Sequence, residues 1–362
     1  MTPLRAIGWP YAGPPTDPGW AQAIAAHPGA RPARVTEQHR SGYVVAEAPG
    51  EGYSPESRPE WQRAKCPPEQ RPAVGDWVLV EGEGKAARIV ALLPRFSAIK
   101  RGAAGEHYKQ QLIAANIDTA FVVCGLDADF NPRRIERYLL LLSGSGVQPV
   151  VVLTKADKDG ADPDATVQSL SATLAQGVMV LAVNAKDRDS VATLEPWLGE
   201  GRSVVLVGSS GAGKSTLTNT LLGIDKMKIG AVRETDDRGR HTTTHRALVV
   251  LPTGACIIDT PGMRELKPTG EEDVAESFAD IEAIAEHCKF RDCRHAKEPG
   301  CAVRAAVERG ELDAGRVANF LKLRDEVAAA SDQLATRLAQ KANERVQGKA
   351  LHKRLDEKYG KH

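Results

Sequence analysis

The sequence predicts an α/β protein in which a phosphate-binding sheet domain is flanked by a small β-barrel and a helical metal-binding domain. Strands and helices are expected to alternate over residues 106–268, a pattern typical of a mostly parallel sheet. The phosphate-loop pattern GSSGAGKST begins at Gly208, far from the N-terminus. Three cysteines and one histidine gather within residues 288–301, which indicates a metal site.

Composition narrows the class of protein. The chain has 362 residues, of which 42% are apolar and 26% charged, as expected for a globular protein. Its net charge of +1 argues against a polybasic nucleic-acid binder. No apolar run approaches the roughly 20 residues that span a bilayer, and the N-terminal segment lacks the apolar stretch of a signal peptide. We therefore expect a cytoplasmic protein with no membrane contact.

The N-terminal third predicts an arm followed by a barrel. Residues 1–33 are rich in Pro, Gly and Ala, which favours a flexible arm. Residues 34–105 alternate short apolar segments with turn residues, for example at Gly42–Val45, Asp76–Val80 and Ala87–Leu92. Short strands at this spacing favour a small β-barrel.

In residues 106–268 longer helices alternate with the predicted strands, which predicts a sheet domain. Asn131 and Pro132 supply an N-cap and a first helical residue for a helix that extends to about residue 142. Further helices are expected at about 164–176 and 214–222. Strands are expected at Thr119–Cys124, Val150–Leu153, Val178–Val183, Ser203–Val207, Ala247–Leu251 and Ala255–Ile258.

The loop Gly208–Thr216 lies between a predicted strand and a predicted helix, where backbone N–H groups and the helix dipole attract phosphate. In such loops the lysine, here Lys214, reaches the β- and γ-phosphate oxygens. The hydroxyl of Ser215 is then the candidate ligand for Mg²⁺. The pattern indicates a nucleoside triphosphate without naming the base.

Two upstream loops indicate guanine. Thr154-Lys155-Ala156-Asp157 follows one predicted strand, and Asn184-Ala185-Lys186 follows the next. The Asp157 carboxylate can accept hydrogen bonds from the ring N–H and amino group of guanine, while the Lys155 stem packs on the ring. Each loop alone could be an ordinary charged turn. Two loops at the ends of two strands, where open α/β sheets bind ligands, favour a base pocket.

Downstream, the segment Asp259-Thr260-Pro261-Gly262 follows another predicted strand. Asp259 can hold Mg²⁺ through water, and the Gly262 N–H can sense a γ-phosphate. One threonine of residues 242–244 is expected to cap the γ-phosphate and Mg²⁺, and we favour Thr243; the alternative for the run is an extended edge strand. The base-reading loops thus precede the phosphate loops, so the functional set is complete but cyclically permuted.

The C-terminal part, residues 269–362, predicts a helical domain with a closed zinc site. The spacing C-x4-C-x-H-x5-C offers three thiolates and one imidazole, a full tetrahedral set for structural Zn²⁺. The expected ligands are Cys288, Cys293, His295 and Cys301. His287 is a poorer candidate because it adjoins Cys288.

A basic stripe follows the zinc residues. The residues that recur every four positions are Arg337, Lys341, Arg345, Lys349 and Lys353. Such a stripe is either a solvated helix face or a contact for RNA phosphates. The barrel at 34–105 could add a second nucleic-acid surface.

The order of these motifs, together with the segments DFNPRRIERYLLL and LPRFSAIKR, closely resembles the RsgA (YjeQ) family of circularly permuted GTPases over about residues 34–325. The resemblance implies a circularly permuted P-loop GTPase domain, an N-terminal OB-fold β-barrel and a C-terminal α-helical zinc-binding domain. It implies GTP hydrolysis stimulated by the small ribosomal subunit, with release of the factor, as a late maturation checkpoint. The implied partners are that subunit and its rRNA, and we expect a monomer.

Site residues carry over by position. Met263 stands where many GTPases place a water-orienting glutamine, so the resemblance implies His241 as the catalytic switch residue, with Lys214 and Thr243. The Mg²⁺ ligands are expected to be Ser215, Thr243 and Asp259. The residues expected to contact GTP or GDP are Thr154, Lys155, Asp157, Asn184, Ala185, Lys186, Gly208, Ser209, Ser210, Gly211, Ala212, Gly213, Lys214, Ser215, Thr216, Asp259 and Gly262.

Two residues depart from the family pattern. Thr154 replaces the usual asparagine that braces the phosphate loop, so we expect a looser base pocket. Gly211 stands where potassium-dependent relatives carry asparagine, so no K⁺ requirement is expected. Two alternatives stay open at this point: a P-loop ATPase or kinase, and a nucleotide-gated RNA-binding module with little physiological catalysis.

Overall fold

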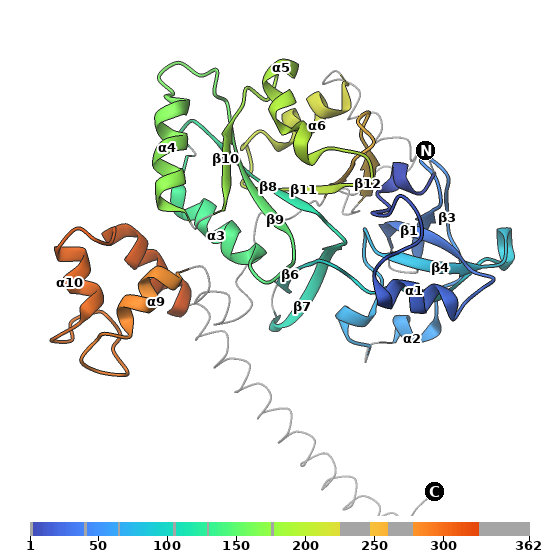
Figure 1. Cartoon of the computed structure of the whole chain (residues 1–362), viewed down its shortest axis with the longest axis horizontal. Helices are drawn as coiled ribbons and strands as arrows, with labels where there is room; N and C mark the ends of the chain where they lie inside the picture. Colours follow the sequence, from blue (N-terminus) through green and yellow to red (C-terminus); the bar gives the residue numbers. More distant parts are fainter. Residues whose placement is uncertain are drawn as a thin grey trace, which may run out of the picture. The chain divides into compact units, whose positions relative to one another are not determined.

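The computed structural model describes residues 3–39, 42–63, 66–103, 106–128, 130–174, 177–224, 247–259 and 278–325. The chain divides into two compact units (Figure 1). Unit 1 comprises Met1–Arg101 and Gln111–Lys267, and unit 2 comprises Gly102–Gln110 and Pro268–His362. The predicted barrel and the predicted phosphate-loop domain therefore belong to one unit.

A mostly parallel sheet forms the centre of unit 1. Its strands, in spatial order, are β10 (Met179–Ala182), β9 (Gln148–Thr154), β8 (Thr119–Gly125), β11 (Ser203–Val207), β13 (Cys256–Asp259) and β12 (Ala247–Val250). The first five run parallel, and β12 runs antiparallel to β13. Strands such as β8 and β11 are buried along their whole length, as continuous apolar runs are in a sheet covered on both faces.

Helices cover both faces of this sheet (Figure 1). α3 (Pro132–Leu142) and α4 (Pro163–Thr173) pack on one face, where Ile135, Tyr138 and Leu170 are buried against β8 and β9. α5 (Arg188–Val191), η4 (Ala192–Trp197) and α6 (Lys214–Leu222) pack on the other face. The Asn131 side chain caps α3 by accepting from the Arg134 N–H, as the sequence predicts.

A second set of strands is antiparallel. The order is β5 (Arg88–Leu92), β4 (Trp77–Glu81), β1 (Arg31–Gln38), β2 (Tyr43–Ala46) and β3 (Gly52–Tyr53). A bridge between Glu56 and Arg88 links the chain after β3 to β5, so the two ends of this sheet meet as in a barrel. Short helices α2 (Pro59–Gln62), η2 (Pro68–Gln70) and η3 (Gly84–Ala86) lie between its strands in sequence. Five curled antiparallel strands agree with the predicted barrel, and its assignment as an OB-fold stays a prediction.

The barrel and the central sheet are continuous. Glu37 of β1 pairs with Ala247 of β12, which joins the two sets of strands into one eleven-stranded sheet. β6 (Ala98–Ala103) and β7 (Glu106–Ala115) form a separate two-stranded sheet in the connection between them. Residues 104 and 105 between these strands, where the predicted domain boundary lies, are outside the described residues.

The N-terminal segment does not agree with the expected flexible arm. Residues 3–30 contain η1 (Arg5–Ile7) and α1 (Pro18–Ala25), and Ile7, Trp9 and Trp20 are buried. The Trp9 and Trp77 rings meet edge to face with centroids 4.7 Å apart. Because each aromatic ring buries a large apolar area, these few side chains outweigh the Pro, Gly and Ala content that suggested an arm.

Arg34 of β1 ties this segment to the rest of unit 1. Its side chain is fully buried, and its three guanidinium nitrogens donate to three backbone carbonyls. The acceptors are Ile7 at 2.6 Å, Gly75 at 3.2 Å and Asn116 at 3.1 Å. A buried charge needs such partners, so Arg34 holds together three segments far apart in the sequence.

Unit 2 is a small helical body. α9 (Ala279–Ala285), α10 (Ala302–Glu308) and a helix over 314–325 enclose Phe278, Ile281, Val303 and Phe320. The loop between α9 and α10 contains the four predicted zinc ligands. The predicted basic stripe at 337–353 lies outside the described residues.

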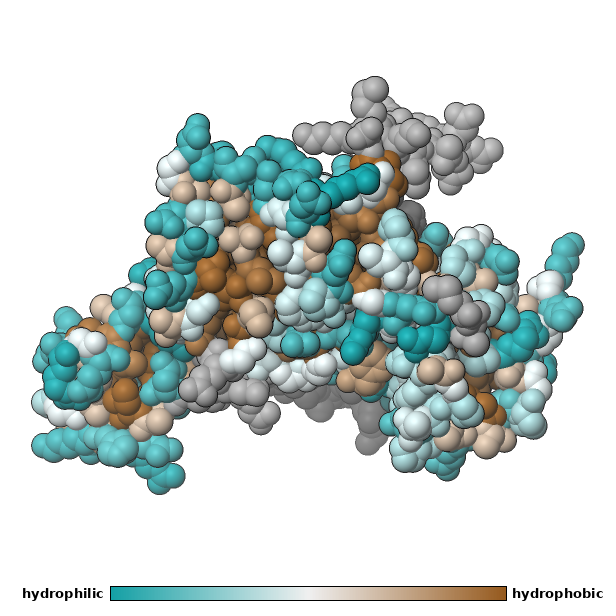
Figure 2. Space-filling view, turned by 45° about the horizontal axis from the view of Figure 1, so that its top comes forward, coloured by the Kyte–Doolittle hydropathy of each residue, from teal (hydrophilic) through white to brown (hydrophobic). Residues whose placement is uncertain are grey.

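Hydrophilic residues surround a central group of hydrophobic ones on the face drawn in Figure 2. Over the described ranges, the large hydrophobic side chains that are exposed are Phe96, Met179, Val249 and Phe290. Within the described part of the chain, no helix is both long enough and apolar enough to cross a membrane.

Candidate nucleotide pocket and metal centre

The phosphate loop follows β11 and ends at α6, as the sequence predicts. Gly208 and Gly213 have φ angles of 150° and 93°. A Cβ atom at Gly208 would lie 2.2 Å from the Val123 carbonyl oxygen, and one at Gly213 would lie 2.8 Å from the Thr154 hydroxyl oxygen. Only glycine fits either place. The backbone is thereby folded tightly at the N-terminus of α6, where anions are stabilised.

Lys214 lies across this loop. Its Nζ donates to the carbonyl oxygens of Gly208, at 2.7 Å, and Ser209, at 2.5 Å. A lysine held by weakly basic carbonyls can exchange them for phosphate oxygens, which carry full charge. Ser215, the next residue, is exposed and therefore accessible to a metal ion.

A pocket of about 230 Å³ adjoins the loop. It lies where β8, β9 and β10 end and α6 begins, so residues from four segments meet there. The predicted base-reading loops and the end of the phosphate loop all contribute to its wall. The lining residues are Asp127, Thr154, Lys155, Asp157, Lys158, Asn184, Ala185, Lys186, Gly213 and Thr216.

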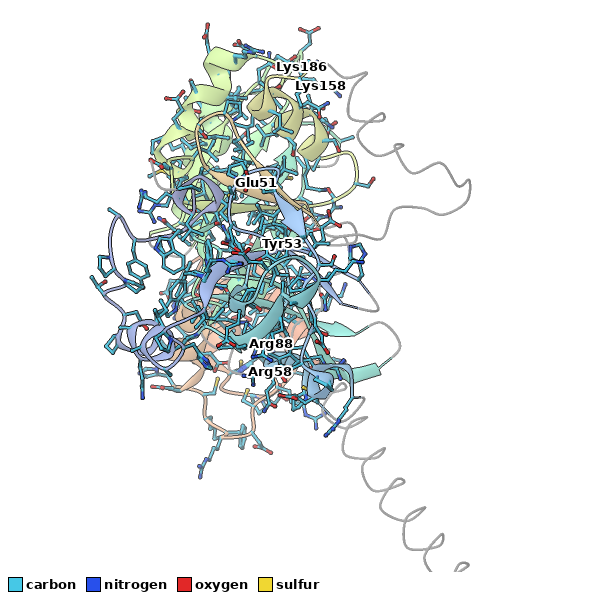
Figure 3. The ribbon with its side chains drawn as sticks, turned by 90° about the vertical axis from the view of Figure 1, so that its right-hand side faces the viewer. Glu51, Tyr53, Arg58, Arg88, Lys158 and Lys186 are labelled. Carbon is cyan, nitrogen blue, oxygen red and sulfur yellow. The ribbon has the colours of Figure 1, made fainter. Side chains whose placement is uncertain are left out.

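Asp157, the predicted base reader, faces Lys186 in this pocket. Its Oδ2 lies 3.3 Å from the Lys186 Nζ, and the Lys186 side chain is 73% exposed. Figure 3 shows Lys158 and Lys186 at the same end of unit 1. An exposed pair of this kind is weak, so a base edge with two N–H donors can displace the lysine.

The Asn184-Ala185-Lys186 loop is held by its own side chains and by α6. The Lys186 N–H donates to the Asn184 Oδ1 at 3.1 Å. The Thr220 hydroxyl of α6 donates to the Ala185 carbonyl at 2.6 Å. The helix that carries the phosphate loop therefore also fixes the second base-contacting loop.

Thr154 does not loosen the pocket in the way that the sequence analysis expects. Its side chain is fully buried, and its hydroxyl donates to the Ala212 carbonyl at 2.5 Å. The short side chain reaches the phosphate loop because Gly213 lets the two backbones approach closely. The bracing contact expected of an asparagine is thus made by a threonine.

Asp127 also lines the pocket, although it belongs to none of the predicted motifs. It follows β8, and its carboxylate lies 2.5 Å from the Lys155 Nζ and 3.6 Å from the Lys158 Nζ. A signal was present in the sequence: an acidic residue two positions after a buried apolar strand, at the edge where parallel strands present ligands.

Three of the predicted site residues lie outside the residues that the structure describes. His241, Thr243 and Gly262 belong to ranges that the structure does not describe. Asp259 is the last residue of β13, which starts beside β11 and ends at the same edge of the sheet as the phosphate loop. The catalytic and magnesium roles of these residues stay predictions.

The four predicted zinc ligands gather in unit 2. The ligand atoms of Cys288, Cys293, His295 and Cys301 all lie within 4.8 Å of one another. The Nδ1 of His295 is 3.6 Å from the Cys288 Sγ and 3.5 Å from the Cys301 Sγ, and those two sulfurs are 4.0 Å apart. Tetrahedral zinc, with Zn–S of about 2.3 Å and Zn–N of about 2.0–2.1 Å, requires similar spacings. The donor set therefore fits one structural Zn²⁺.

The pKa shifts at Cys288 and His295 favour a bound cation, whereas burial raises the pKa of the Cys293 thiol to about 11. Burial opposes ionisation of Cys288, yet the N–H groups of Val303 and Ala302 bring the pKa of its thiol below the usual value. Burial lowers the pKa of His295, which keeps the imidazole neutral and able to ligate. His287 instead contacts the Ala283 carbonyl at 3.0 Å and is exposed.

Comparison with known proteins agrees with this geometry. The sequence profile of the family described as RsgA GTPase matches residues 92–269. The chain is 65% identical over 360 residues to the small ribosomal subunit biogenesis GTPase RsgA of Xanthomonas axonopodis pv. citri (strain 306), covering 99% of this chain and 97% of that protein. It is 66% identical over 347 residues to the protein of the same name from Xanthomonas campestris pv. campestris (strain B100), covering 96% and 94%.

Two solved structures share the fold. The crystal structure of YjeQ from Thermotoga maritima has a TM-score of 0.59 and 24% identity, covering 83% of this chain and 99% of that one. YloQ, titled a circularly permuted GTPase, has a TM-score of 0.56 and 26% identity, covering 83% and 96%. The loops of the pocket occur here in permuted order, and the fold resembles that of a solved structure titled a circularly permuted GTPase.

Proposed function

Because this chain belongs to the RsgA GTPase family, we propose that it hydrolyses GTP to GDP and phosphate as a maturation factor of the small ribosomal subunit. The family implies GTP and GDP as ligands and Mg²⁺ as their metal ion. The observation that supports the proposal most is the pocket in which Asp157, Ala185 and Gly213 meet, although the base-reading segments precede the phosphate loop in the chain.

The roles follow from position. The phosphate loop holds the phosphates, Lys214 exchanges its carbonyl contacts for phosphate oxygens, and Ser215, Thr243 and Asp259 hold Mg²⁺. The bound metal ion would supply neutralisation of charge on the phosphates. Asp157 accepts from the guanine edge, a pattern that adenine does not offer, so an ATPase or kinase is disfavoured.

His241 is proposed to act where a glutamine is absent, since Met263 has no group that can orient water. We expect slow hydrolysis by the isolated protein and stimulation when the small subunit orders the segment around His241. Hydrolysis then lowers affinity for the subunit, so release reports that a late maturation step is complete.

The other modules are proposed to bind rRNA. The barrel, the zinc-binding unit and the basic stripe at 337–353 offer surfaces for phosphates, and the protein is expected to act as a monomer in the cytoplasm, where subunits mature. The Cys288, Cys293, His295 and Cys301 cluster holds zinc in a structural role, since four protein ligands leave no open position.

The test is the rate of GTP hydrolysis with added small subunits, large subunits or bare rRNA. We expect strong stimulation by small subunits alone. Equal rates under all three conditions would instead favour a nucleotide-gated RNA-binding module with little catalysis.

A further inference from the structure

Asp127 has no role in the function proposed above, yet it is part of the pocket wall. It lies in the turn that follows β8, and the N–H of the preceding residue, Leu126, donates to the Thr154 carbonyl at 2.8 Å. This bond fixes the turn against the end of β9. The Asp127 side chain is only 15% exposed, so its carboxylate is held within the pocket region.

The Lys155 ammonium pairs with Asp127. The Nζ to Oδ2 distance is 2.5 Å, which is short even for a charge-assisted hydrogen bond. A Cβ atom at Gly125 would lie 3.0 Å from the Asp127 Oδ1 and 3.1 Å from the Lys155 Nζ. The pair therefore packs directly over the backbone of Gly125.

Lys155 also has an unusual backbone. Its φ angle is +62°, in the left-handed region that residues with a side chain seldom adopt. Such a conformation persists where surrounding contacts hold it, and it is concentrated at ligand sites. The Asp127 carboxylate supplies a contact of that kind at the far end of the same residue.

The charges in the pocket determine which carboxylate each lysine faces. Lys155, Lys158 and Lys186 all line it, and Asp127 faces the first two while Asp157 faces the third. Without Asp127, the Lys155 ammonium would have Asp157 as the other carboxylate of the pocket to approach. A lysine that swings toward Asp157 can no longer offer its alkyl stem as a flat wall.

We propose that Asp127 is a positioning residue for purine binding: it anchors the Lys155 ammonium so that the lysine stem forms the wall on which the guanine ring packs. This inference rests on the proposed function, because it requires a guanine nucleotide in the pocket. Asp127 contributes to the ring face and not to the ring edge, which distinguishes its effect from that of Asp157.

The test measures the Kd of GDP, IDP and ADP by calorimetry for the full-length protein and for Asp127→Asn. We expect GDP and IDP affinity to fall together, by roughly 5- to 20-fold, because the amide that replaces the carboxylate holds the ammonium only through a neutral acceptor. IDP lacks the amino group that Asp157 reads, so an unchanged GDP-to-IDP ratio places the effect on the ring face. A changed ratio would overturn the assignment.

A double-mutant cycle separates positioning from a structural role. In a Lys155→Met background, Asp127→Asn should have no further effect on GDP affinity, because the ammonium that it anchors is gone. Additive effects would overturn the proposal. Arg202→Met is the matched control: that arginine is 60% exposed and lies 3.0 Å from Asp118, a carboxylate that is also 15% exposed but outside the pocket wall, so the variant should change the Kd less than twofold.

Two outcomes keep this inference distinct from the proposed function. A wild type that binds ADP as tightly as GDP would overturn the proposed function, whereas a guanine-selective wild type with an unaffected Asp127→Asn variant would overturn only the role of Asp127. If Asp127→Asn does not fold, Lys155→Met tests the pair from its other side. It should weaken GDP and IDP binding by a similar factor, and wild-type affinity would contradict the proposal.

Discussion

The hydroxyl of Thr154 lies 2.5 Å from the carbonyl oxygen of Ala212, so the end of β9 is hydrogen-bonded directly to the phosphate loop. Both residues are fully buried. The base-reading loop and the phosphate loop, which are 58 residues apart at this contact, are therefore joined by a buried hydrogen bond. A nucleotide that engages one loop finds the other already in place, which reduces the entropic cost of binding.

Removing this hydroxyl is expected to weaken nucleotide binding. Thr154→Val keeps the shape of the side chain but leaves the Ala212 carbonyl without its donor, at a cost of about 1–2 kcal/mol. GDP affinity measured by calorimetry should fall by about 5- to 30-fold. Thr193→Val is the control, because that hydroxyl also donates to a carbonyl, of Ser190 at 2.9 Å, but is exposed and outside the pocket wall. Equal effects of the two variants would refute the role of Thr154.

Asp157→Asn is expected to change which purine is preferred. The variant replaces an acceptor-only group by an amide with a donor, so it should lose roughly 10- to 100-fold in GDP affinity. It should gain affinity for xanthosine diphosphate, whose ring carries an oxygen in place of the amino group. Competition binding with GDP, XDP and ADP checks this, and an unchanged order of preference would show that Asp157 does not read the base.

Arg34 is expected to be important for stability rather than for chemistry. Arg34→Met removes three hydrogen bonds to buried carbonyls, of which that of Gly75 still accepts from the Asn116 amide at 3.3 Å, so the free energy of unfolding in urea should fall by about 3 kcal/mol. Arg88→Met is the matched control: its side chain is 65% exposed and pairs with Glu81 at the surface, so it should cost less than about 1 kcal/mol. Similar losses in both variants would contradict the role given to Arg34.

The zinc ligands are expected to stabilise unit 2 without affecting nucleotide binding by unit 1. His295→Ala or Cys301→Ser should lower the bound zinc well below one equivalent and destabilise unit 2, because metal binding and folding are coupled in small closed sites. GDP affinity, which depends on unit 1, should stay within about twofold of wild type. The His287→Ala variant should keep its full content of zinc, because His287 is not one of the four expected ligands. Metal analysis and calorimetry decide, and full zinc content in His295→Ala would exclude that residue as a ligand.

The central sheet could be predicted from the sequence because its strands are continuous apolar runs and its helices begin at clear caps such as Asn131-Pro132. The N-terminal segment could not, since Trp9 and Trp20 are buried against Trp77 and Leu93, whose proximity depends on the fold. The composition of a segment does not reveal which distant residues it packs against.

In the pocket, the motif residues could be predicted because phosphate and guanine recognition require particular groups at particular spacings. For Asp127 the sequence shows only an acidic residue near a strand end; its contact with Lys155 depends on the pairing of β8 with β9, which brings its turn beside that lysine. The bracing by Thr154 was also missed, since it depends on the close approach that Gly213 allows. Short-range contacts between distant segments are what the sequence alone does not reveal.

The claim on which the account depends is that segments in permuted order build one guanine-nucleotide site. A crystal structure with a non-hydrolysable GTP analogue and Mg²⁺ tests it most directly. We expect the purine between Asp157 and the Lys155 stem, and the phosphates at the loop that begins with Gly208. A purine bound elsewhere, with Asp157 still paired to Lys186, would contradict it.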